Sequence, residues 1–167
     1  MNEAAGAAAT WVGSLTRVVQ DVVSSRHAEA RPAPMQIKGP ILVVDANGVM
    51  ARIVTERLGQ IGLADVQTST SLRHTLTNLE TTRYGLVLCE YDTHPLTGFD
   101  LWRIITGREE WKTTPFILMA DEERKRANIT RFEEAGLPVV LAKPFSAEQL
   151  AASIELVTSG NPFSAFV

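Results

Sequence analysis

The sequence contains a single cysteine, Cys89, and no apolar run that approaches the ~20 residues of a membrane-spanning helix. One cysteine excludes an internal disulfide and is typical of a protein from a reducing compartment. The first ten residues lack the basic start of a secretory signal, because Glu3 is the only charged side chain there. We therefore expect a cytoplasmic protein.

The chain also lacks a large excess of positive or negative charge. The 167 residues carry a formal net charge of −3, with 21% charged and 45% hydrophobic residues, which is the composition of a globular protein. Such a chain has no broad electrostatic attraction for nucleic acid or for an anionic membrane, so we expect neither as a partner. The length allows one domain with an extension rather than two full domains.

The chain divides into three segments that differ in composition and in hydrophobic pattern. Residues 1–36 predict an amphipathic helix followed by a linker rich in proline and alanine. The apolar stripe of this helix consists of four residues: Trp11, Leu15, Val18 and Val22. Such a stripe needs a partner, which is its own domain, a second copy of the chain in a homodimer, or another protein. Residues 37–158 predict the domain, and residues 159–167 form a tail with two phenylalanines.

Strands and helices alternate five times within the predicted domain. Continuous apolar runs rich in β-branched residues indicate strands that are buried on both faces. The expected strands are 41–44, 65–68, 86–89, 116–119 and 139–141. The expected helices are 49–61, 72–79, 99–105, 122–135 and a last helix to about 157, where Ser146 and Gln149 form a capping box. This alternation predicts an α/β fold, a parallel sheet with helices on both faces.

Three charged residues follow three different strands of this sheet. In an open parallel sheet, chemistry takes place at the carboxyl ends of the strands, beside the point where the strand order reverses. Asp45, Glu90 and Lys143 stand at such ends, so we expect two carboxylates and one ammonium group in a single cleft.

The order and spacing of several short motifs resemble the receiver domains of bacterial response regulators. These motifs are Ile-Leu-Val-Val-Asp (41–45), Leu-Val-Leu-Cys-Glu (86–90), Gly98, Pro-Phe-Ile-Leu-Met (115–119), Ala-Gly (135–136) and Lys-Pro-Phe (143–145). The resemblance implies a flavodoxin-like, doubly wound sheet of five strands in the order 2-1-3-4-5, with the N-terminal helix as an addition. It also implies a role in phosphorelay signalling.

The resemblance further implies a particular chemistry. In that family an aspartate after the third strand accepts a phosphoryl group, an acidic pair after the first strand holds Mg²⁺, and a hydroxyl and a lysine bind the phosphoryl oxygens. This sequence keeps Asp45 and Lys143. It departs at four positions: Ala46 for the second acid, Glu90 for the acceptor, Ala120 for the hydroxyl and Val140 for an aromatic residue of the fifth strand.

Each departure removes part of that chemistry. Ala46 lacks a metal ligand, Ala120 has nothing to donate, and Glu90 is longer than an aspartate by one methylene. We therefore expect no enzyme activity and no cofactor, with at most weak Mg²⁺ binding by Asp45 and Glu90, which Asp92 could assist. The Glu90 carboxylate is expected to reach Lys143. Whether it imitates the phosphorylated state or has merely drifted stays open.

The sequence thus predicts a stand-alone, degenerate receiver that acts by binding protein partners. A histidine kinase, a phosphotransferase or a motility component is expected as the partner. Two alternatives remain open. The first is a working receiver that is phosphorylated with Mg²⁺, and the second is an adaptor that binds a cyclic dinucleotide through Arg124 and Arg126 in a basic helix.

Overall fold

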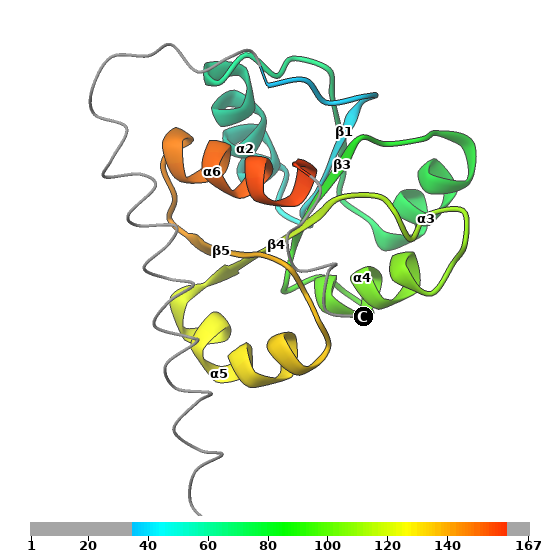
Figure 1. Cartoon of the computed structure of the whole chain (residues 1–167), viewed down its shortest axis with the longest axis vertical. Coiled ribbons are helices and arrows are strands. Elements are labelled where there is room, and N and C mark those ends of the chain that lie inside the picture. Colours follow the sequence, from blue (N-terminus) through cyan, green and yellow to red (C-terminus); the bar gives the residue numbers. More distant parts are fainter. Residues whose placement is uncertain (1–34, 160–167) are drawn as a thin grey trace, which may run out of the picture. The chain divides into compact units, whose positions relative to one another are not determined.

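The computed structural model describes residues 35–159, which form one five-stranded sheet between two layers of helices (Figure 1). The strands are β1 (Ile41–Val44), β2 (Val66–Ser69), β3 (Leu86–Glu90), β4 (Phe116–Asp121) and β5 (Val140–Lys143). The helices are α2 (Gly48–Gln60), α3 (Leu72–Thr81), α4 (Gly98–Thr106), α5 (Glu122–Glu134) and α6 (Ala147–Thr158). All neighbouring strands are parallel, and their order is β2-β1-β3-β4-β5, which confirms the fold class.

The two faces of the sheet have separate apolar cores because successive side chains of a strand point to opposite sides. Leu42 and Val44 of β1 pack into the core under α3, α4 and α5, whereas Ile41 and Val43 pack into the core under α2 and α6. Figure 1 shows this division, with α2 and α6 together on one side of the sheet. Every residue of β1 and β3 is buried, as their continuous apolar runs predicted.

The ends of four strands differ from the predictions, and one of them is β4, which runs to Asp121 rather than to residue 119. β2 runs from Val66 to Ser69 instead of over 65–68. Asp65 lies just before the strand, and its carbonyl accepts the backbone N–H of Ile41. β3 includes Glu90, and β5 runs from Val140 to Lys143 rather than over 139–141. Apolar runs stop at the first charged residue, but backbone pairing continues, so that Lys143 is still in register with Asp121. Glu90 and Lys143 are therefore held by the sheet itself.

Helix caps fix the loops at the carboxyl edge of the sheet. The predicted capping box of α6 is confirmed, because the Ser146 hydroxyl accepts from the Gln149 backbone and the Gln149 side chain accepts from the Ser146 backbone. A second capping box, formed by Thr97 and Asp100, starts α4. A hydrogen bond from the Thr97 hydroxyl holds the pKa of Asp100 below its usual value, assisted by the Arg131 guanidinium.

Two predicted features lie outside the described residues. These are the N-terminal helix with Trp11, Leu15, Val18 and Val22, and the tail from residue 160 onward. The described residues belong to a compact unit that begins at Pro34. Within residues 35–159, no helix has both the length and the apolar character needed to cross a membrane.

Candidate functional site

The candidate site lies at the carboxyl edge of the sheet, where β1, β3 and β5 end. Asp45 directly follows β1, Glu90 is the last residue of β3, and Lys143 is the last residue of β5. β3 pairs with β1 on one side and with β4 on the other, and β4 pairs with β5. The sheet thus brings the two predicted carboxylates and the predicted lysine to the same edge.

An ion pair between Glu90 and Lys143 occupies the centre of the site. The Lys143 Nζ donates to Oε2 of Glu90, which is the contact expected from the sequence. The side chains of Glu90 and Lys143 are 7% and 23% exposed, so the pair is largely withdrawn from water. The second oxygen of Glu90, Oε1, accepts the backbone N–H of Asp92 at 3.2 Å. Both carboxylate oxygens of Glu90 are therefore engaged by the protein.

Asp45 is buried and stabilises the turn that leads into α2. Its Oδ1 accepts the backbone N–H of Asn47 at 2.8 Å. Asn47 is in turn the N-cap of α2, because its side-chain oxygen accepts from the backbone N–H groups of Val49 and Met50. One oxygen of Asp45 is thus part of the backbone structure of the loop.

The residues present do not fit a magnesium site. Mg²⁺ in proteins is usually held by one or two carboxylates together with water in near-octahedral geometry. Here Ala46 supplies no ligand, Glu90 uses both oxygens within the protein, and Asp45 uses one. Within residues 35–159, no three His, Cys, Asp or Glu side chains are grouped so that they could hold a metal ion.

The Asp92 carboxylate, expected to assist in the acidic pocket, lies elsewhere. Its Oδ2 is 3.3 Å from Nε of Arg124 on α5, and both side chains are about half exposed, at 47% and 54%. Asp92 contributes its backbone N–H to the site, through Glu90, but its side chain turns toward the helix. The prediction missed this because Arg124 lies 32 residues further along the chain.

The two positions expected to lack signalling groups are apolar parts of the core. Ala120 is fully buried in β4, in register with Ala142 of β5. Val140 is half-buried and packs against the core under α3, α4 and α5. Neither side chain has a polar atom that could respond to a charge at position 90.

Two residues shape the loop after β3: Gly98, which entered the sequence prediction only as part of the family pattern, and Tyr91, which was overlooked. A Cβ atom at position 98 would lie 2.2 Å from the carbonyl oxygen of Glu90, so the close approach of α4 to β3 requires Gly98. Tyr91 is buried, and its carbonyl accepts the Gly98 N–H at 2.9 Å. An aromatic residue beside a strand-end carboxylate was the available signal for Tyr91.

Cys89 is fully buried directly before Glu90, as predicted for a residue of the strand core. Burial raises the pKa of its thiol well above the usual value, and the charges of Glu90 and Asp45 raise it further. The thiol is therefore protonated and packs as a small apolar side chain.

Comparisons with known proteins agree with this fold. Residues 41–155 match the response regulator receiver domain family. The chain is 29% identical over 117 residues to the chemotaxis protein CheY of Pseudomonas aeruginosa, covering 70% of this chain and 94% of the relative. It is 30% identical over 117 residues to CheY-3 of Vibrio cholerae, covering 70% and 89%.

Solved structures give the same result for the fold. CheY4 of Vibrio cholerae superimposes with a TM-score of 0.62 at 22% identity, covering 71% of this chain and 98% of that structure. The receiver domain of a Pseudomonas aeruginosa sensor histidine kinase, which holds a magnesium ion in its active-site cleft, has a TM-score of 0.64 at 22% identity and covers 73% and 98%. The chain belongs to the response regulator receiver domains, and it is therefore a protein of two-component signalling.

Proposed function

We propose that this receiver domain works without being phosphorylated and acts as a cytoplasmic protein-interaction module. The Glu90–Lys143 ion pair carries this proposal, because it occupies both the acceptor position and the lysine that would bind a phosphoryl oxygen. A buried carboxylate with a protein contact on each oxygen is a poor nucleophile, since attack would first require breaking one of these contacts. The pair supports a domain that stays in a single state.

The side chains around this pair support the same conclusion. Phosphoryl transfer depends on positioning and on neutralising the developing charge, usually with a metal ion. Ala46 and Ala120 supply neither a metal ligand nor a hydroxyl, and the carboxylates present do not fit Mg²⁺. The proposed function therefore uses the shape of the domain rather than its chemistry.

The names of the relatives suggest the kind of partner. The two relatives from Pseudomonas aeruginosa and Vibrio cholerae compared by sequence are chemotaxis proteins, and we infer a partner from the same class of pathway: a histidine kinase, a phosphotransferase or a motility component. The apolar stripe Trp11, Leu15, Val18 and Val22 is proposed as a second contact surface, for this partner or for a second copy of the chain.

Exposure to a small phosphodonor tests the proposal. The full-length protein is incubated with acetyl phosphate and Mg²⁺, and its intact mass is measured. We expect no phosphoryl adduct, and we expect none in Glu90→Asp, because this variant restores the acceptor but not the ligand at Ala46 or the hydroxyl at Ala120. The receiver domain of a magnesium-binding relative serves as the positive control.

One outcome would replace the proposal with the alternative of a working receiver. This outcome is an adduct in good yield on the natural protein that disappears in Glu90→Gln. An adduct that persists in Glu90→Gln would come from another nucleophile and would leave the proposed role of Glu90 intact.

A further inference from the structure

The loop between β3 and α4 contacts one face of α5. The Asp92 carboxylate pairs with Arg124 at 3.3 Å, and the Tyr91 hydroxyl lies 3.5 Å from Oδ1 of Asn128. The Tyr91 ring also packs edge-to-face on Phe132, with 5.8 Å between ring centroids. Arg124, Asn128 and Phe132 are spaced four residues apart, so they form one stripe along the helix. Two consecutive loop residues thus hold the whole length of this stripe.

The same two residues are attached to the candidate site. The Asp92 N–H donates to Oε1 of Glu90, while Oε2 of Glu90 accepts from Lys143. The Tyr91 N–H donates to the carbonyl of Met119 in β4 at 2.7 Å. A continuous path of contacts therefore runs from Lys143 through Glu90 and the loop to α5.

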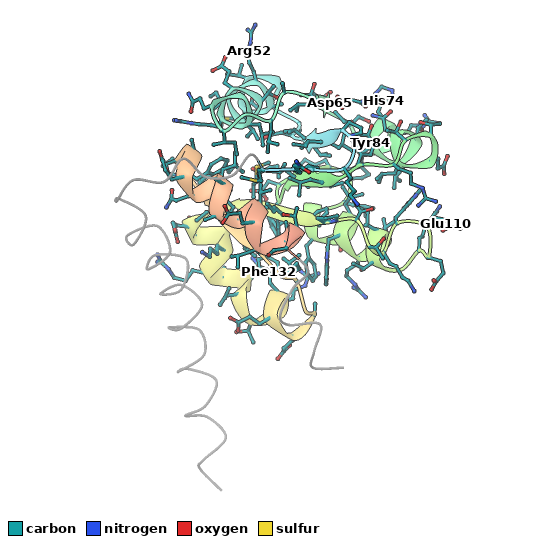
Figure 2. All side chains as sticks on the ribbon, turned by 45° about the horizontal axis from the view of Figure 1, so that its top comes forward. Arg52, Asp65, His74, Tyr84, Glu110 and Phe132 are labelled. Atoms are coloured by element: carbon teal, nitrogen blue, oxygen red, sulfur yellow. The ribbon has the colours of Figure 1, made fainter. Side chains whose placement is uncertain are left out.

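α5 has few other apolar contacts that would fix its position. Within Glu122–Glu134 only Phe132 is buried, and most of the remaining side chains are charged. Phe132, labelled in Figure 2, joins the helix to the core by packing against Phe99 with centroids 5.1 Å apart. Arg131 adds a contact with the Phe99 ring at 4.6 Å and an ion pair with Asp100 at 4.0 Å. A helix with a single buried side chain is still sensitive to the additional contacts along its stripe.

We propose that Tyr91 and Asp92 are positioning residues that fasten α5 to the Glu90–Lys143 pair. The residue at position 90 then sets how firmly α5 is held, through the loop rather than through the apolar side chains of Ala120 and Val140. An exposed ion pair alone stabilises little, so the packing and the hydroxyl of Tyr91 carry a share of the fastening. The inference rests on the proposed function in one respect, because an unphosphorylated Glu90 makes the fastened state permanent.

Amide hydrogen exchange of the full-length protein tests this inference. We expect the peptides of α5 to exchange several-fold faster in Tyr91→Phe and in Arg124→Gln, and faster still in the double variant. Peptides of β1 and α6 should be unchanged in all three. Arg126→Gln is the matched control: it removes the same charge from an exposed position of the same helix and should leave α5 exchange unchanged.

A change at position 90 tests the connection to the site. Glu90→Gln should speed α5 exchange in the natural background and add little in the Tyr91→Phe, Arg124→Gln background. Faster exchange of the β1 peptides would reveal that Glu90→Gln loosens the whole domain. In that case Glu90→Asp replaces it, because the shorter aspartate keeps the charge but draws the carboxylate away from the backbone N–H of Asp92. Unchanged α5 exchange in the double variant would overturn the inference, and so would an equal effect of the change at position 90 in both backgrounds. No phosphodonor is present, so this result is independent of the phosphorylation test.

Discussion

Glu90 and Lys143 show how a charged pair can become part of a protein's structure. Both side chains are largely withdrawn from water, and their charges compensate each other near the end of the sheet. Removing one partner from a buried pair leaves an uncompensated charge, which is typically more costly than replacing both partners by apolar groups.

Stability measurements on single and double variants follow from this. We expect the single variant Lys143→Met to lower the free energy of unfolding by about 3–5 kcal/mol. The double variant, which adds Glu90→Gln, should lower it by less, because no unpaired charge remains. Urea denaturation gives these values. Lys112→Met is the control: its pair with Glu109 is exposed, and we expect a change of only about 0–1 kcal/mol. A double variant that is no more stable than Lys143→Met would contradict a compensated pair.

Gly98 is a second residue whose type the structure requires. A Cβ at this position would also lie 2.9 Å from Cδ1 of Leu118, so the clash involves backbone and core together. We expect Gly98→Ala to destabilise the domain by about 1–3 kcal/mol. Gly59→Ala is the matched control in α2, where a Cβ meets nothing within 4 Å and should stabilise the helix by roughly 0.5–1 kcal/mol. Thermal denaturation of both variants checks the contrast in sign.

Among the elements, α4 and α6 begin with capping boxes that differ in chemistry. The box of α4 uses the carboxylate of Asp100, which titrates, whereas the box of α6 uses the amide of Gln149, which does not. The pKa of Asp100 is lower in the folded protein than in the unfolded chain. Its contribution to stability is therefore present at neutral pH and is lost as the pH falls through the folded pKa.

A comparison of two alanine variants over pH tests this sign. The destabilisation caused by Asp100→Ala should be full at pH 7 and should shrink as the pH falls below the usual aspartate pKa of about 3.9. The destabilisation caused by Gln149→Ala should stay constant over the same range. A constant effect of Asp100→Ala would show that its charge does not act through the cap.

The segment before the domain, which lies outside the described residues, is predicted to carry an apolar stripe. Burying four side chains such as Trp11, Leu15, Val18 and Val22 is worth roughly 1.5–3 kcal/mol each before the loss of entropy is subtracted. We expect deletion of residues 1–30 to abolish capture of the natural partner or to change the oligomer. Affinity capture and light scattering of the full and shortened chains measure this. If the shortened chain captured the same partner and had the same oligomeric state as the full chain, the stripe would have no role in binding.

For the whole molecule, the sequence predicted the sheet better than the contacts of its loops. β1 is a continuous apolar run, and β3 and β4 are such runs up to their charged last residues, Glu90 and Asp121. A run of that kind has few alternatives to a central strand. The edge strand β2, Val66–Ser69, is mostly polar, so its pattern was weak and its predicted start was one residue early.

The candidate site divides in the same way. The contact between Glu90 and Lys143 could be predicted because both residues end strands of a sheet whose topology was expected. The contacts of Tyr91 and Asp92 with α5 depend on the path of a seven-residue loop (91–97) and on the rotation of a helix, and residue spacing determines neither. The predicted place of Asp92 in the acidic pocket failed for that reason.

The burial of Cys89 gives the molecule an internal reporter of its own opening. The thiol is the one sulfhydryl of the chain, lies at the centre of the sheet and is kept protonated by its surroundings. The side chain lies in the core under α3, α4 and α5. An alkylating reagent can therefore reach it only when this core opens, and the labelling rate measures how often this occurs. Conditions or partners that tighten the domain would slow the alkylation of this single sulfur atom, so that mass spectrometry can follow the opening of the core without an engineered cysteine.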